Sequence, residues 1–193
     1  MSNTLKEKIR IINCSHERLK KIFLNTVQHY ALDDVHEIRL VGKKLKGSTM
    51  QAQPVFNLKS LFSGISIYRI RFSKHVRGSR NLKINELPED VLTGWFAHEI
   101  GHVKDYTQQS FWGMIGYGFR YLTSASFRKK IEHRADTIAI ENGFHEEVLA
   151  TKKFLFSNDL IESSYRDKMK KYYMPLEDVE EWIYKNVTID PVD

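Results

Sequence analysis

The residues most able to do chemistry lie in the run His98-Glu99-Ile100-Gly101-His102, an HExxH pattern. On a helix the two histidines, four residues apart, project from one face, so both imidazoles can bind one divalent metal ion. Glu99 can then lie beside a metal-activated water, where a carboxylate acts as a general base. Because short patterns also arise by chance, this interpretation depends on the elements around the run.

A third metal ligand has to come from another part of the chain, because a catalytic zinc takes three protein ligands. Two known extensions of the pattern would need histidine at Tyr106 or at Gln108. Acidic residues instead occur in Glu132-His133-Arg134-Ala135-Asp136. Glu132 and Asp136 would share a helix face, so one can bind metal while the other orients a ligand histidine. His133 and Asp136 stay open as alternative ligands.

Both runs lie on predicted helices. Pro88 suits a first helical turn, and the apolar residues after it recur at helical spacing, which predicts a helix over 88–106. The same spacing predicts a second helix over 126–142, which ends at Gly143. Further helices are expected over 146–156, 160–172 and 176–184.

The chain before residue 86 is expected to form N-terminal helices over 1–34 and a small mixed sheet over 35–85. Alternating or β-branched stretches at 36–41, 50–56 and 65–72 predict the strands. Residues 86–193 would form the helical part that holds the metal site. We therefore predict a single α+β domain over 1–193.

The two motifs on successive helices resemble those of the gluzincin zinc metallopeptidases, which pair HExxH with a later ExxxD. The chain is most similar to the branch with the CAAX prenyl proteases and the heat-shock membrane peptidases, as a soluble form. Glu132, Ala135 and Asp136 match the second motif of that branch, and Arg134 departs from it. The resemblance covers roughly residues 87–143 and implies a zincin-like fold.

This resemblance implies one Zn²⁺ per chain, bound by His98, His102 and Glu132. It also implies that Glu99 is the general base and that Asp136 orients a ligand histidine, His98. The expected activity is hydrolysis of peptide bonds by a metal-activated water, with an extended peptide or protein substrate along an edge strand, for which we favour 65–73. The donor that stabilises the oxyanion is left open among Tyr165, Tyr172, Tyr173 and His145.

Charge is divided unevenly along the chain. Residues 1–85 carry 17 basic and 5 acidic side chains, and residues 86–193 carry 13 and 19. Seven basic residues and no acidic one lie in 59–83. This basic region supports an alternative function, a non-catalytic zinc-stabilised regulatory protein that binds nucleic acid or an acidic partner. For a peptidase, nucleic acid is not an expected partner. A peptidase that cleaves one particular cellular protein is a third possibility.

The expected location is cytoplasmic, because Cys14 is the only cysteine and the start of the chain lacks an apolar run of signal-peptide length. Segment 111–122, between the motifs, is aromatic and rich in glycine but too short to span a bilayer. We expect it to line the substrate cleft or to pack in the core. Peripheral membrane association through 111–122 is the alternative, since membrane-embedded relatives in the resembled branch carry spans in this region.

Overall fold

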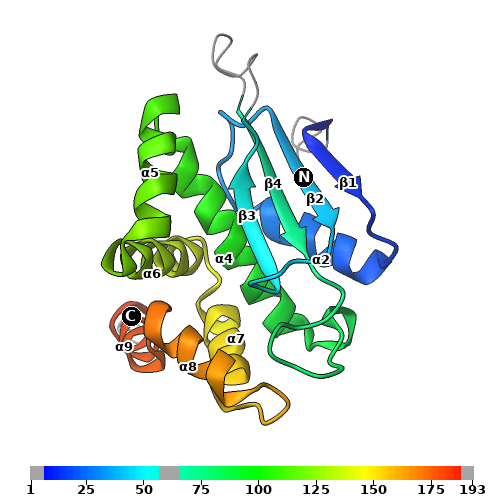
Figure 1. Ribbon diagram of the computed structural model, residues 1–193, viewed down its shortest axis with the longest axis vertical. Coiled ribbons are helices and arrows are strands. Elements are labelled where there is room, and N and C mark those ends of the chain that lie inside the picture. The colour runs from blue at the N-terminus through cyan, green and yellow to red at the C-terminus, as the bar shows by residue number, and fades with distance from the viewer. Residues whose placement is uncertain (1–6, 57–65, 188–193) are drawn as a thin grey trace, which may run out of the picture.

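The computed structural model describes residues 7–56 and 66–187, which form an α+β arrangement of seven α-helices and one four-stranded mixed sheet (Figure 1). The strands are β1 (Ile9–Ile12), β2 (Glu37–Gly42), β3 (Met50–Pro54) and β4 (Ile67–Phe72). The helices are α2 (Glu17–Val27), α4 (Glu89–Thr107), α5 (Phe111–Thr123), α6 (Ala125–Glu141), α7 (His145–Ser157), α8 (Ser163–Tyr172) and α9 (Leu176–Val187), with a short 3₁₀ turn at Ile84–Glu86. The predicted α+β class is thereby confirmed.

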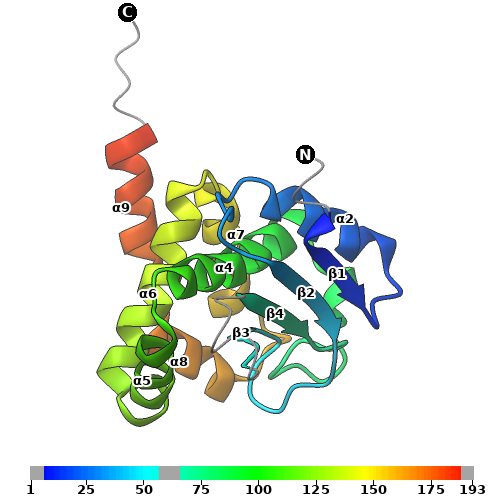
Figure 2. The ribbon, with the colours of Figure 1, turned by 90° about the horizontal axis from the view of Figure 1, so that it is seen from above.

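The sheet has the strand order β1-β2-β4-β3. Strands β1, β2 and β4 are parallel, and β3 runs antiparallel to β4 at one edge. Its inner face contributes Ile38, Leu40 and Ile70 to a core that also holds Phe23 of α2 and Phe96 of α4. These two helices cover one face of the sheet, and among residues 7–56 and 66–187 no helix covers the other face (Figure 2).

The prediction of N-terminal helices over 1–34 is wrong for Ile9–Ile12, which form strand β1. Three of its four residues are isoleucines, whose branched side chains favour strands. Ile9 and Ile11 align with Ile38 and Leu40 of β2, so the strand extends two apolar rows of the inner face. The spacing of these few apolar residues fits a helix as well as a strand. The sheet therefore begins before the predicted boundary at residue 35.

Helix α5 occupies the segment between the two motifs, where the sequence predicts no particular element. Its three glycines lower helix propensity. The side chain of Ser110 caps the helix by accepting a hydrogen bond of 3.1 Å from the backbone N–H of Gly113. Among the described residues, no helix has both the length and the apolar composition needed to cross a bilayer.

Helix α4 lies at the centre of the molecule, between the sheet on one side and α6 and α7 on the other (Figures 1 and 2). Thirteen of its nineteen residues are buried. Gly94 makes the close contact with α7 possible, because a Cβ atom at this position would lie 2.0 Å from the carbonyl oxygen of Glu147. The candidate site residues of α4 are thus held on a largely buried helix.

Candidate metal centre

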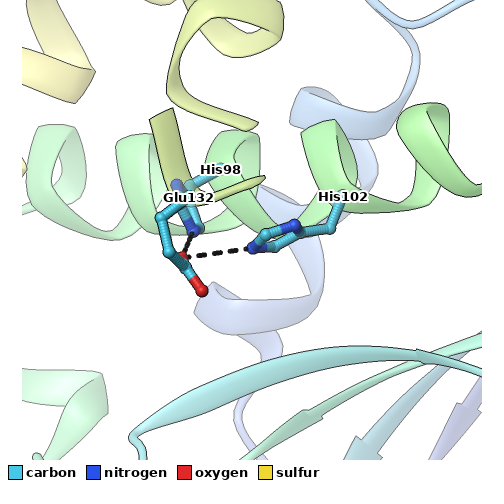
Figure 3. A group of neighbouring side chains, drawn as sticks. All are labelled: His98, His102 and Glu132. Atoms are coloured by element: carbon cyan, nitrogen blue, oxygen red, sulfur yellow. Dashed lines mark hydrogen bonds and ion pairs between the residues drawn. The ribbon is translucent and has the colours of Figure 1, made fainter. Parts of the chain in front are cut away.

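Two histidines of α4 and one glutamate of α6 meet in the interior (Figure 3). Their ligand atoms all lie within 4.8 Å of one another, and all three residues are buried. One carboxylate oxygen of Glu132 lies 3.1 Å from Nε2 of His98 and 3.4 Å from Nε2 of His102. The structure thus brings together the three residues predicted as metal ligands.

The crossing of α4 and α6 explains how residues on separate helices reach one another. Gly101 lies between the two histidines, and Ala135 lies between Glu132 and Asp136. A Cβ atom at Gly101 would lie 2.5 Å from the carbonyl oxygen of Ala135, closer than real Cβ contacts come. Only glycine at this position allows the two backbones to approach this closely.

Asp136 lies beside the metal-binding cluster, where its role was predicted to be the orientation of a ligand histidine. Its Oδ1 lies 2.8 Å from Nδ1 of His98. Its Oδ2 accepts hydrogen bonds from the buried amine of Lys152 at 2.7 Å and from the backbone N–H of Met174 at 3.2 Å. Burial works against ionisation of Asp136, but Lys152 and His98 outweigh it and lower the pKa of Asp136 to about 2.

Glu132 is held by a side chain that the motifs do not contain. The hydroxyl of Tyr121, on α5, donates a hydrogen bond to the second carboxylate oxygen of Glu132. Burial would raise the pKa of the Glu132 carboxyl, but His102 and His98 hold it well below its usual range. Burial likewise opposes protonation of His98, yet Asp136 and Glu132 raise the pKa of His98 to about 10. The cluster therefore combines an ionised carboxylate with two imidazoles that face it.

The donors fit a zinc ion better than a hard cation. Two imidazoles and one carboxylate form a donor set of catalytic zinc sites, whereas Mg²⁺ and Ca²⁺ prefer oxygen ligands alone. The Nδ1 of His98 is occupied by Asp136, which leaves its Nε2 for a metal, as is usual for ligand histidines. The Nδ1 of His102 is buried and has no hydrogen-bond partner in the part of the chain that the structure describes.

Glu99 lies beside this cluster and contacts the edge of the sheet. Its Oε2 accepts a hydrogen bond of 2.5 Å from the backbone N–H of Ala52 in β3. The side chain is buried, and burial raises the pKa of Glu99. A carboxyl with a raised pKa is a stronger proton acceptor than an exposed one. Glu132 and Asp136, in contrast, each bind a neighbouring side chain.

A cleft of about 900 Å³ opens on the metal-binding cluster. Glu99, His102 and Glu132 line it, together with strand β3 and side chains of α5 and α8. The edge strand along this cleft is β3, so the expectation that 65–73 forms the edge is wrong. Strand β4 is paired on both sides, by β2 and by β3. The order of strands in a sheet depends on long-range pairing, which a local pattern does not contain.

Comparisons of the chain with models of known protein families, with curated proteins and with solved structures find no match. The chemistry proposed for this chain therefore depends on the geometry of the cluster and the cleft.

The remaining predicted site residues fall into two groups. Tyr165, Tyr172 and Tyr173 line the cleft, and the ring of Tyr173 stacks on His98 with the centroids 5.1 Å apart. In contrast, His145 packs against Trp182 and is not part of the cleft wall. His133, considered as an alternative ligand, is not a member of the cluster that His98, His102 and Glu132 form.

Arg134, the residue that departs from the resembled motif, has a structural role of its own. Its guanidinium group pairs with the buried carboxylate of Asp105 on α4 and donates a hydrogen bond of 2.6 Å to the side chain of Gln108. Asp105 also accepts a hydrogen bond of 2.8 Å from the hydroxyl of Tyr117 on α5. One acidic residue of α4 thus fastens both α5 and α6 beside the site.

The described basic residues of region 59–83 lie in different places on the molecule. Arg69 and Arg71 lie on the outer face of the sheet, where each donates a hydrogen bond to a glutamine of β3. Lys83 pairs with Glu86 at 2.9 Å. Lys74 and Arg77 line a separate cavity at the end of the sheet. Lys59 lies outside the described residues.

Proposed function

We propose that this chain is a zinc-dependent peptidase with a zincin-like fold. The observation that supports the proposal best is that the metal-binding cluster and Glu99 open on one cleft along the free edge of an antiparallel strand. A metal site that only stabilised the fold would have a fourth protein ligand and would not have to open on a cleft. Here the described donors number three, and one side of the cluster faces the cleft.

His98, His102 and Glu132 would hold the zinc ion. Zinc in such a site acts as a Lewis acid and lowers the pKa of a water molecule toward neutrality. Asp136 and Lys152 fix the ring of His98, and Tyr121 fixes the carboxylate of Glu132. These outer contacts keep the donors in place before a metal or substrate binds.

Glu99 would accept a proton from the attacking water and pass it to the leaving amine. The hydrogen bond from Ala52 holds one oxygen of its carboxylate against the edge strand, and the other oxygen is left for the proton. The cleft tyrosines 165, 172 and 173 remain the groups that could donate a hydrogen bond to the oxygen of the scissile carbonyl.

An extended peptide would bind along β3. In this strand the odd residues pair with β4, as the bonds of Thr49 and Val55 show, so the backbone groups of Met50 and Ala52 point to the other edge. Those of Ala52 already contact Glu99 and the hydroxyl of Tyr106, so a peptide would pair with Met50 or displace these two side chains. A peptide laid antiparallel or parallel to this edge would place a backbone carbonyl near Glu99. The alternative, a non-catalytic zinc-stabilised protein whose basic region 59–83 binds an acidic partner, would need neither the cleft nor Glu99.

Removal of a ligand should remove the metal. We expect near one zinc per chain in wild type, and loss of zinc in His98→Ala and in Glu132→Ala, because two donors alone hold zinc weakly. His133→Ala is the matched control, since this neighbour on α6 lies outside the cluster. Zinc per chain is measured by mass spectrometry of protein purified without an affinity tag. Zinc that persists in Glu132→Ala would place the third ligand elsewhere.

We further propose that helix α5 contacts anionic membrane surfaces. Four large apolar side chains along it, Trp112, Ile115, Phe119 and Leu122, are 72%, 45%, 68% and 75% exposed. Residues 110–131 also carry four basic side chains and no acidic one. Exposed aromatic and aliphatic side chains beside basic ones are typical of helices that lie in a membrane interface. The opposite side of α5 lines the cleft with Met114, Tyr117 and Tyr121, and Leu122 at the end of the helix lines the cleft as well.

Flotation with lipid vesicles tests this contact. We expect wild type to float with phosphatidylcholine vesicles that contain phosphatidylserine, and the double variant Trp112→Ser with Phe119→Ser to stay in the dense fraction. Leu160→Ser is the control, because Leu160 is 64% exposed and lies between α7 and α8, not on α5. If wild type floats with neither type of vesicle, α5 is not a membrane contact.

A further inference from the structure

A second cavity, of about 690 Å³, lies at the end of the sheet where the parallel strands finish. Its walls are the segments that directly follow β1, β2 and β4, namely 13–16, 42–45 and 72–79. The arrows of these three strands end on the same side of the sheet (Figure 1). Ligands of open sheets with parallel strands commonly bind beyond the carboxyl ends of the strands. The volume lies within the range of small-molecule sites.

The charge of the cavity wall is entirely of one sign. Lys43, Lys44, Lys74 and Arg77 line the cavity, and no aspartate or glutamate does. In the described ranges 7–56 and 66–187, none of these four cations has an ion-pair partner. Four unpaired positive charges around one hollow repel one another and attract a multiply charged anion.

Hydroxyl groups add hydrogen-bond donors to the same wall. Ser15 and Ser48 supply hydroxyls, whereas the hydroxyl of Ser79 already donates to the carbonyl oxygen of Val76 at 2.7 Å. Helix α2 begins beside the cavity, where its N-cap residue His16 forms part of the wall but gives no side-chain hydrogen bond to the first turn. Glu17, the acidic residue of the first turn, is held by Lys20 at 2.6 Å and is not part of the wall.

We propose that this cavity binds a small molecule that carries a phosphate or pyrophosphate group. Lysine and arginine side chains together with hydroxyls are donors that recognise phosphate oxygens. The apolar side chains of Leu45, Val76 and Ile84 line the same cavity and provide a surface for the uncharged part of the ligand. The proposal does not depend on the metal centre, although Lys44, Leu45 and Ser48 also line the catalytic cleft.

Isothermal titration calorimetry with pyrophosphate, ATP and adenosine tests the proposal. We expect saturable binding of pyrophosphate and ATP and none of adenosine. The double variant Lys74→Glu with Arg77→Glu should weaken this binding by about tenfold or more. Lys21→Glu with Lys170→Glu is the matched control, because it changes the net charge equally at exposed positions outside the cavity. The Glu132→Ala variant should bind pyrophosphate as wild type does, which separates this site from chelation of the metal.

Three results would overturn the proposal. One is the absence of binding by pyrophosphate and ATP in wild type. Another is an equal loss of binding in the cavity variant and in the matched control, which would show a general effect of net charge. A signal that disappears in Glu132→Ala would also count against it, because the probe would then bind the metal and not the cavity.

Discussion

Glu99→Gln is expected to abolish hydrolysis of peptide bonds while the zinc content and the fold stay unchanged. Glutamine has the shape of glutamate and can still accept the hydrogen bond from Ala52, but it cannot take a proton from water. General base catalysis contributes about 10²–10⁴-fold to a rate, so we expect cleavage to fall by about 10³-fold. The loss should appear in the rate and not in the amount of bound zinc.

This measurement uses a mixture of many protein substrates. A native cell lysate, incubated with wild type or variant and labelled at newly formed N-termini, reports cleavage of many proteins at once, including a single specific target. Glu141→Gln is the control, since Glu141 is exposed at the end of α6. Equal cleavage by wild type and Glu99→Gln would show that Glu99 is not the base. A wild type that binds zinc and cleaves nothing would favour the non-catalytic alternative.

The three residues of the buried cluster that could hold a metal could be picked out from the sequence because their spacing is local. His98 and His102 lie one helical turn apart, and so do Glu132 and Asp136, so each pair carries its own geometry wherever its helix packs. The helices themselves were predicted well, since 88–106 and 126–142 correspond to Glu89–Thr107 and Ala125–Glu141. The spacing does not determine which helices pack together. The pairing of the helix that carries His98 with the helix that carries Glu132 was expected from the resemblance.

The contacts that support the ligands could not be predicted in the same way. Lys152 of α7 and Tyr121 of α5 reach the site from helices without any motif, and each meets its partner only through the tertiary fold. A lysine in an amphipathic helix is normally predicted to be solvent-exposed, yet Lys152 is only 2% exposed. The position of β3 at the edge of the sheet could not be predicted for the same reason, because strand order is set by pairing between distant segments.

These supporting contacts explain why the site needs three helices around α4. Removal of the carboxylate of Asp136 would leave the Lys152 amine buried without a partner, since the two groups lie 2.7 Å apart in the interior. An uncompensated buried charge is costly, whereas the paired charges hold His98 in place. The outer contacts thus tie the geometry of the metal ligands to the packing of α6 and α7 on α4.

Gly101→Ala should cost both zinc and stability, although it adds only one methyl group and changes no ligand. The added Cβ would lie 2.5 Å from the carbonyl oxygen of Ala135, and a backbone atom cannot turn away as a side chain can. Helix α6 must therefore move away from α4 and carry Glu132 with it. Overpacking of this kind costs about 1–3 kcal/mol. We expect a lower melting temperature in the presence of a chelator and zinc affinity reduced by about tenfold or more.

Gly116→Ala is the matched control for this change, because it is the same substitution on a neighbouring helix. A Cβ at Gly116 meets nothing within 4 Å, so alanine there should raise stability by about 0.5–1 kcal/mol through helix propensity. Thermal unfolding and zinc titration of both variants separate the two effects. If Gly101→Ala melts and binds zinc as wild type does, the close crossing of α4 and α6 does not set the position of Glu132, and the ligand geometry must be held by Tyr121 and the histidines instead.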